Sequence, residues 1–174
     1  MASSPQPSAT VAPPKPQRSG VVEYDVKKCL TCRECEVACS LYHERECNPA
    51  QSRIQIDFDD FVPGFPDIRV CKQCDFPACY FACADRWGDD PAITIDPETG
   101  ARAIDPDKCR GCGACLRACP LTPERSVIAF KAGEGKKRIY FKCDLCAGRP
   151  EGPICVQICP GEALTFVPAS ERRR

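Results

Sequence analysis

The chain has 174 residues, and its 24 acidic side chains balance its 24 basic ones, so no overall charge points to nucleic acid as a partner. No stretch approaches the roughly 18 consecutive apolar residues of a membrane span, and the sequence opens on neither a secretory signal nor a twin-arginine leader. We therefore expect a cytoplasmic protein with no nucleic-acid partner and no membrane span, in a compartment where cysteines stay reduced.

The composition of the two ends of the chain indicates tails outside the folded part. Residues 1–20 contain five prolines and no aromatic residue, which predicts a flexible, disordered N-terminal tail. Residues 169–174 form a basic C-terminal tail, and we expect the charges of Arg172 to Arg174 to be solvated.

Cysteine dominates the sequence between these tails. Sixteen of the 17 cysteines fall into four groups of four, and only Cys47 stands outside them. In chain order the groups are Cys29, Cys32, Cys35 and Cys39; Cys71, Cys74, Cys79 and Cys83; Cys109, Cys112, Cys115 and Cys119; and Cys143, Cys146, Cys155 and Cys159. The chain is therefore built from four similar units.

Each group has a strand-like segment before it and another after it. The expected strands, in chain order, are 21–26, 54–58, 68–70, 93–95, 101–104, 127–130, 139–141 and 164–167. Short helices are expected near the later cysteines of each group, over 34–42, 78–86, 114–118 and 154–158. A Pro-Glu-Thr-Gly turn predicts a hairpin over 93–104, and residues 131–138 form a second hairpin or an exposed loop.

The spacing within the groups indicates 4Fe-4S clusters. In the first and third groups three cysteines follow one another at steps of three, so that one loop can wrap three corners of an iron-sulfur cube. Gly111 and Gly113 fit this loop because a chain that lies close to a cube has little room for a Cβ atom. We therefore predict four 4Fe-4S clusters with the sixteen grouped cysteines as iron ligands.

Cysteine has two other common structural uses. A disulfide scaffold is common in short cysteine-rich secreted chains, but cysteines at steps of three pair poorly with their neighbours. Single C-x2-C steps open the second and fourth groups and are compatible with zinc, whereas the three consecutive steps of the other groups favour cubanes.

The third group, CRGCGACLRACP, resembles the bacterial ferredoxin run in which the fourth cysteine ligates the second cluster of a pair. The order of all four groups resembles the iron-sulfur subunits of molybdenum and tungsten pterin oxidoreductases. That resemblance implies an α+β fold of two ferredoxin-like dicluster modules, with an inner module (61–135) inserted into an outer one (21–60 and 136–168).

The resemblance also implies which cysteines share a cluster. The outer module would hold one cluster on Cys29, Cys32, Cys35 and Cys159 and another on Cys143, Cys146, Cys155 and Cys39. The inner module would hold one on Cys71, Cys74, Cys79 and Cys119 and another on Cys109, Cys112, Cys115 and Cys83. The strands agree with this nesting, because a hairpin ties group two to group three while the first and last strands are free to pair.

No catalytic motif appears, which predicts a non-catalytic electron-transfer subunit. The block CLTCRECEVACSLYHERECNPAQSRIQI is similar to small polyferredoxins of tungsten-containing aldehyde oxidoreductases and of benzoyl-CoA reductase assemblies. This implies a tungstopterin or molybdopterin catalytic subunit as partner, together with an FAD/NAD-binding subunit or ferredoxin. Copies of the chain could also associate with one another, which would extend the chain of clusters along which electrons move. The aldehyde oxidoreductase type is the partner we favour. The alternatives are a subunit of a benzoyl-CoA reductase assembly, a subunit of a dimethyl sulfoxide reductase type enzyme, and a cluster- or zinc-based regulatory or assembly protein.

Four further features carry separate expectations. His43 is either a hydrogen-bond donor near a cluster or a proton-coupled modulator of its potential. The interpretation we favour is a helix-end histidine bonded to backbone. Cys47 is interpreted as an inert buried side chain rather than a spare ligand or a redox-sensitive thiol, and Trp87 as a packing residue. Ser40 and Ala84 replace the prolines that follow groups three and four, a change expected to alter local rigidity rather than the number of clusters.

Overall fold

The computed structural model describes residues 17–58 and 66–173, and over these ranges short strands alternate with α-helices. The strands are β1 (Val21–Tyr24), β2 (Ile54–Asp57), β3 (Asp67–Val70), β4 (Ile93–Ile95), β5 (Arg102–Ile104), β6 (Ile128–Ala132), β7 (Arg138–Lys142) and β8 (Leu164–Val167). The helices are α1 (Glu34–Glu44), α2 (Ala78–Trp87), α3 (Ala114–Ala118) and α4 (Ile154–Ile158), with 3-10 turns at Pro49–Gln51 and Glu134–Lys136. None of the described helices is both long and apolar enough to cross a membrane.

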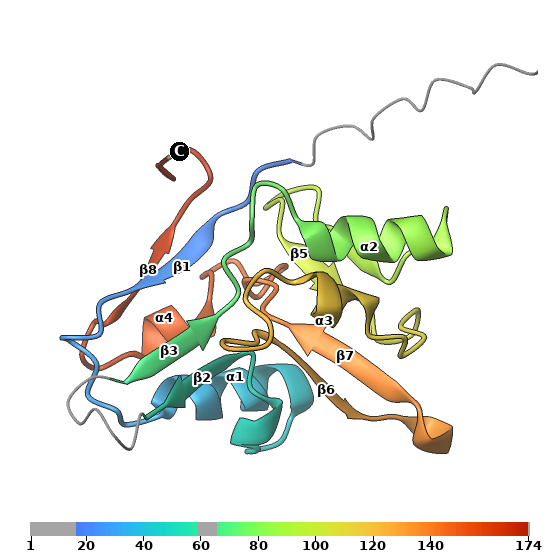
Figure 1. Ribbon diagram of the computed structural model, residues 1–174. Helices are drawn as coiled ribbons and strands as arrows, with labels where there is room; N and C mark the ends of the chain where they lie inside the picture. The colour runs from blue at the N-terminus through green and yellow to red at the C-terminus, as the bar shows by residue number, and fades with distance from the viewer. Residues whose placement is uncertain (1–16, 59–65, 174) are drawn as a thin grey trace, which may run out of the picture.

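The strands form antiparallel pairs rather than one sheet: β1 with β8, β2 with β3, β4 with β5, and β6 with β7. Two expectations are confirmed, because β4 and β5 form the hairpin over 93–104 and the first strand pairs with the last. Figure 1 shows β1 and β8 side by side although they come from opposite ends of the chain. Residues 131–138 belong to the hairpin β6–β7, whereas the pairing of β2 with β3 was not expected.

Alternating apolar residues hold these small sheets in register. On β2 and β3, Ile54 lies opposite Val70 and Ile56 lies opposite Ile68, and none of the four side chains is more than 2% exposed. Cross-strand pairs of β-branched residues on one face are the unit that stabilises so small a sheet. Burial of that face therefore fixes the register of the hairpin.

The helices begin at the same point in every group, and proline decides where two of them end. The third cysteine of each group is the second residue of its helix. Helices α3 and α4 are five residues long and end before Pro120 and Pro160, since proline disfavours helical backbone in the preceding residue. Ser40 and Ala84 lift that restriction, so α1 and α2 run for 11 and 10 residues and extend to Glu44 and Trp87, beyond their expected ends.

Two clusters of buried side chains form the core, and cysteines contribute to both. Helix α1 contacts α4 beside the first cluster, which includes Ile54, Ile68 and Cys155. Helix α2 contacts α3 beside the second, which includes Ile93, Tyr140 and Cys115. The hairpins β2–β3 and β6–β7 cross the expected boundaries at 60/61 and 135/136, so strands from both expected modules share each cluster.

Parts of both expected tails are packed where the structure describes them. Residues 1–16 lie outside the described range, but Ser19 is fully buried and Arg18 pairs with Asp75 at 3.1 Å, so packing begins before residue 20. The expectation of a solvated charge at Arg172 is wrong. Its guanidinium donates to the carbonyls of Ser19 (3.0 Å) and Gln73 (2.9 Å), because β1–β8 pairing brings the two chain ends together.

Replacement of Arg172 by alanine should destabilise the fold. Hydrogen bonds that involve a charged group contribute about 1.5–3 kcal/mol, and the side chain of Arg172 is 14% exposed. We expect Arg172→Ala to lower the free energy of unfolding by about that amount in anaerobic denaturant titration. The control is Arg173→Ala, which removes the same charge from an exposed residue; equal stability of the two variants would contradict this role of Arg172.

Candidate iron-sulfur cluster sites

The structure brings cysteines of different groups together at four places, and Cys112 is counted with the place that holds its neighbours Cys109 and Cys115. We name the sets site 1 (Cys29, Cys32, Cys35, Cys159), site 2 (Cys143, Cys146, Cys155, Cys39), site 3 (Cys71, Cys74, Cys79, Cys119) and site 4 (Cys109, Cys112, Cys115, Cys83). The four cysteines of site 1 line one hollow, and the four of site 3 line another. Cys159 therefore lies with thiols from the opposite end of the chain.

Mutual electrostatic effects locate the thiols of sites 2 and 4. Burial raises the pKa of Cys155, and the nearby thiols Cys39 and Cys146 raise it further. Burial likewise raises the pKa of Cys143, with Cys155 as the next contributor. At site 4, burial raises the pKa of Cys115 to about 12, and Cys109 and Cys83 are among the thiols that add to the rise.

The same backbone turn recurs in all four groups. The second residue after the first cysteine has a positive φ in each, at Thr31 (57°), Gln73 (45°), Gly111 (70°) and Leu145 (61°). Three of these are not glycine, and such residues avoid this conformation unless the surrounding structure imposes it. Alternation of right- and left-handed backbone turns successive N–H groups to one side, which is the concavity found at many Fe–S sites.

Backbone N–H groups reach the sulfur atoms directly. Arg53 donates to Cys39 Sγ at 3.3 Å and Ala163 to Cys159 Sγ at 3.3 Å. Tyr140 donates to Cys109 Sγ and Leu145 to Cys143 Sγ, both at 3.4 Å. Sets of four thiols with N–H donors directed at sulfur match the needs of a thiolate-held 4Fe-4S cluster, so the residues present fit that cofactor.

Burial favours the protonated form of several of these thiols when no metal is bound. It raises the pKa of Cys35 to about 12, and the pKa values of Cys79 and Cys146 to about 11. Thiolate is the form that ligates iron, so formation of a cluster at these sites releases protons and is favoured by higher pH.

Neighbouring sites also lie near one another, in a fixed order. Cys35 of site 1 is close enough to raise the pKa of Cys155 of site 2, after the larger effect of burial. Cys71 of site 3 likewise raises the pKa of Cys143 of site 2. Cys79 of site 3 raises the pKa of Cys115 of site 4. The sites therefore follow one another in the order 1, 2, 3, 4.

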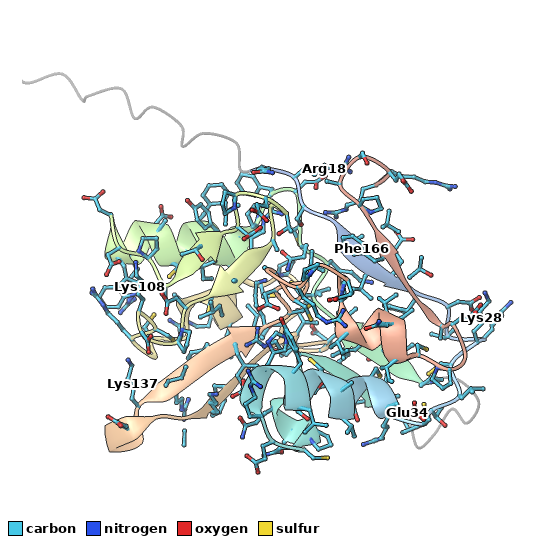
Figure 2. All side chains as sticks on the ribbon, turned by 180° about the vertical axis from the view of Figure 1, so that it is seen from behind. Arg18, Lys28, Glu34, Lys108, Lys137 and Phe166 are labelled. Atoms are coloured by element: carbon cyan, nitrogen blue, oxygen red, sulfur yellow. The ribbon has the colours of Figure 1, made fainter. Side chains whose placement is uncertain are left out.

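The row runs from one side of the molecule to the other. Lys28, next to Cys29 of site 1, and Lys108, next to Cys109 of site 4, lie on opposite sides in Figure 2. At the first end Cys32 is exposed, and the neighbouring Leu30 is 64% exposed.

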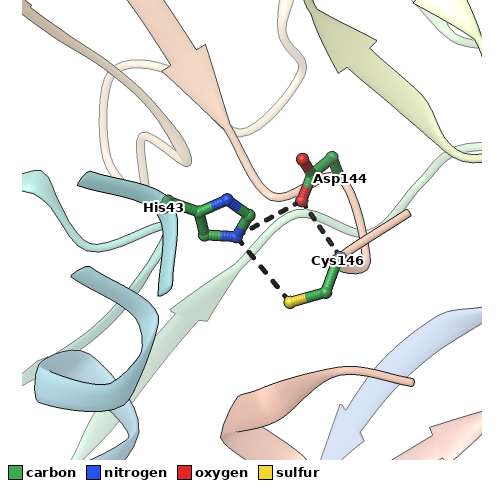
Figure 3. Close-up of side chains that lie close together, drawn as sticks. All are labelled: His43, Asp144 and Cys146. Atoms are coloured by element: carbon green, nitrogen blue, oxygen red, sulfur yellow. Dashed lines mark hydrogen bonds and ion pairs between the residues drawn. The ribbon is translucent and has the colours of Figure 1, made fainter. Parts of the chain in front are cut away.

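His43 approaches a thiol of site 2, contrary to the backbone-bonded role favoured above. Its Nε2 atom lies 3.7 Å from Cys146 Sγ and 3.5 Å from Asp144 Oδ1, as Figure 3 shows. Burial lowers the pKa of His43 to about 4 against the opposing effect of Asp144, so the ring is neutral at pH 7. A neutral ring protonated at Nε2 can donate to the sulfur.

These three residues place ligand atoms within 4.8 Å of one another, close enough for a metal ion. Asp144, however, already accepts from Arg53 Nη1 at 2.5 Å and from the Cys146 N–H at 3.0 Å. We therefore count Cys146 with site 2 and place no separate metal here.

Trp87 occupies the position equivalent to His43 in the neighbouring repeat. Each residue stands eight positions after the third cysteine of its group, at the end of a helix that no proline shortens. The expected packing of Trp87 is confirmed against the second core cluster. Partial burial raises the pKa of Cys112, but hydrogen bonds from Ala114 and from Trp87 outweigh this effect and lower it. Each lengthened helix thus brings a ring nitrogen to the second cysteine of another group.

The expectation for Cys47 was wrong, because this cysteine is exposed. It follows the end of α1 and precedes the 3-10 turn Pro49–Gln51, where the chain runs over the surface. Sequence reasoning also missed the buried cations Arg102 and Lys142, which line the hollow of site 3. Nothing in their spacing distinguishes them from exposed strand residues.

Comparison with known families agrees with this geometry. Residues 64–169 match the model of the 4Fe-4S dicluster domain. The chain belongs to the 4Fe-4S dicluster family. As a member of that family it binds iron-sulfur clusters.

Two relatives of this dicluster protein have described roles. It is 43% identical over 133 residues to the aliphatic sulfonate oxidoreductase polyferredoxin-like subunit of Pyrococcus furiosus, a match that covers 76% of this chain and 66% of that protein. It is 31% identical over 159 residues to the electron transport protein HydN of Escherichia coli, with 82% and 85% covered. A chain of a solved structure, the active site complex BamBC of benzoyl coenzyme A reductase, matches with a TM-score of 0.46 and 25% identity, over 87% of this chain and 80% of that one.

A side chain at Gly111 should disturb site 4. An added Cβ atom would lie 2.5 Å from the Arg138 carbonyl oxygen, in addition to the strain of φ +70°. Gly111→Ala should cost about 1–2 kcal/mol for the backbone and about 1–3 kcal/mol for the clash. Anaerobic denaturant titration measures the loss. Gly148→Ala is the matched control because φ is +85° and nothing lies within 4 Å of the added atom; equal losses would show that close packing at Gly111 is irrelevant.

Proposed function

We propose that the chain is a non-catalytic electron-transfer subunit that relays electrons through four 4Fe-4S clusters, one at each site. The observation that carries this proposal is the row of four thiol sets, in which each set lies beside the next. The name of the electron transport relative HydN agrees with such a role. When bound, the clusters supply one-electron chemistry, while the chain supplies the thiols, the N–H donors and the order of the row.

The ligand sets belong to this proposal. We assign sites 1 and 2 to an outer ferredoxin-like module (21–60 and 136–168) and sites 3 and 4 to an inner module (61–135). Contact of α1 with α4 and of α2 with α3 supports this division, as does the pairing of β1 with β8. Each cluster then receives three cysteines from one group and the fourth from its partner group.

We further propose that the catalytic partner is a tungstopterin subunit of the aldehyde oxidoreductase type. A flavin subunit or another redox protein, which we place in the cytoplasm, would exchange electrons with the far end of the row. The first-group block and the likeness to a subunit of a sulfonate oxidoreductase support an oxidoreductase partner. A benzoyl-CoA reductase assembly and a dimethyl sulfoxide reductase type enzyme are the alternatives.

Iron and acid-labile sulfide analysis of anaerobically purified protein tests the cofactor content. Four clusters require about sixteen iron and sixteen sulfide per chain. Zinc without sulfide would contradict the proposal and support a zinc scaffold instead.

The crossed ligand sets predict where a lost thiol acts. Cys159→Ala should disturb the cluster of site 1, whose other ligands lie at Cys29 to Cys35. NMR resonance assignments locate the disturbance. A disturbance among residues around Cys29 would support the ligand set of site 1, and one confined to Cys143 and Cys146 would refute it. Cys47→Ala is the control, because this exposed cysteine belongs to no site and its loss should leave iron content unchanged.

The partner proposal is tested by anaerobic purification from the native host. A tag on this chain should retrieve a large polypeptide together with about one tungsten per complex. Molybdenum in place of tungsten would point to the dimethyl sulfoxide reductase type alternative, and recovery of the chain alone would count against a permanent partner.

A further inference from the structure

Two buried cations face the hollow of site 3. Arg102 is 1% exposed and Lys142 is 2% exposed, and both line the hollow together with the four cysteines of that site. Burial raises the pKa of Cys79, and Lys142 opposes that rise. Burial lowers the pKa of Arg102, and Cys71 and Cys79 oppose that change. Both cations therefore lie near thiols of site 3. A charge that has left water for such a position is costly unless an opposite charge compensates it.

Neither cation forms an ion pair with a carboxylate in the described part of the chain. Lys142 Nζ donates only to the backbone carbonyls of Arg102 and Cys143. Arg102 Nη2 donates to the carbonyl of Gln17 at 2.8 Å, while its Nε and Nη1 atoms have no acceptor. Asp75 is near enough to influence Arg102, but it already pairs with Arg18 and Arg172. The hollow of site 3 therefore carries uncompensated positive charge.

The other sites lack this feature. Near site 2, Arg53 pairs with Asp144. At site 4, Arg110 is exposed, stacks on Trp87 at 4.2 Å and is screened by solvent. At site 1, the side chain of Arg33 is 48% exposed. Two hollows in the described part of the chain are lined by four thiols, those of sites 1 and 3, and of these only the hollow of site 3 is lined by buried, unpaired cations.

We propose that Lys142 and Arg102 make site 3 the strongest electron acceptor of the row. This inference rests on the proposed function. A 4Fe-4S core held by four thiolates is anionic and gains a further negative charge when it is reduced. Two fixed positive charges in a water-poor hollow stabilise that added charge more than exposed ones do. An electron that enters at either end of the row reaches site 3 from site 2 or from site 4. In that step the cluster at site 2 or site 4 is oxidised and the cluster at site 3 is reduced. The electron then resides longest at site 3.

EPR-monitored redox titration of the anaerobically purified, four-cluster protein tests the proposal with Lys142→Met. At a fixed potential, the ratio of reduced to oxidised cluster should fall about tenfold for one of the four transitions, equivalent to about 59 mV for one electron. The other three should change less than about twofold. Lys137→Met, in the same hairpin but exposed, is the matched control and should move none of them.

Further variants identify the cluster and separate charge from shape. The transition that Lys142→Met shifts should be the one that Cys74→Ser alters, and Arg102→Met should shift it in the same direction. Lys142→Arg keeps the charge and should restore the original ratio. If Lys142→Met loads fewer than four clusters, Lys142→Arg must restore loading for the proposal to stand.

Three results would overturn the inference: unchanged transitions in both neutral variants, a shift that belongs to another cluster, or failure of Lys142→Arg to restore the property that is lost. A wild-type protein without about sixteen iron would instead remove the proposed function on which the inference rests. Four loaded clusters with no shift would remove this inference alone.

Discussion

The fold depends on contact between cysteine thiols that come from distant parts of the chain. Each site takes a thiol from a second group, and Cys159 joins Cys29 only because β1 and β8 pair. The sheets have two strands each and two of the helices have five residues, so ordinary apolar packing is limited. Cysteines accordingly stand among the residues of both core clusters. In a protein of this kind cofactor loading and folding are coupled, because the groups that fill the core are also the ligands.

Electrostatics then differentiates sites that share one design. The left-handed turn recurs in all four groups, and N–H bonds reach sulfur atoms of sites 1, 2 and 4. Ring nitrogens supplied by the lengthened helices reach sites 2 and 4, and buried cations line site 3. Hydrogen bonding, burial and nearby charge are the means by which a protein sets the potential of a cluster. The four sites of this row are therefore similar in ligands and different in surroundings.

The sequence was informative where a covalent or conformational rule acts locally. Regular cysteine steps predicted the loops, the Pro-Glu-Thr-Gly turn predicted β4–β5, and the starts of all four helices were predicted at the residue where they begin. The absence of proline at Ser40 and Ala84 is a further signal in the sequence, because it lengthens two helices and brings His43 and Trp87 to thiols. Contacts set by tertiary packing were not predictable: the pairing of β2 with β3, the exposure of Cys47 and the burial of Lys142 and Arg172 depend on which segments meet.

An iron anomalous-scattering map from crystals of the anaerobically purified protein tests the central claim most directly. The account predicts four cubes in a row, with the sulfur of Cys159 bonded to the same cube as that of Cys29 and the sulfur of Cys39 bonded to the cube of Cys143. Four cubes each held by the cysteines of a single group would contradict it, as would isolated metal ions in place of cubes.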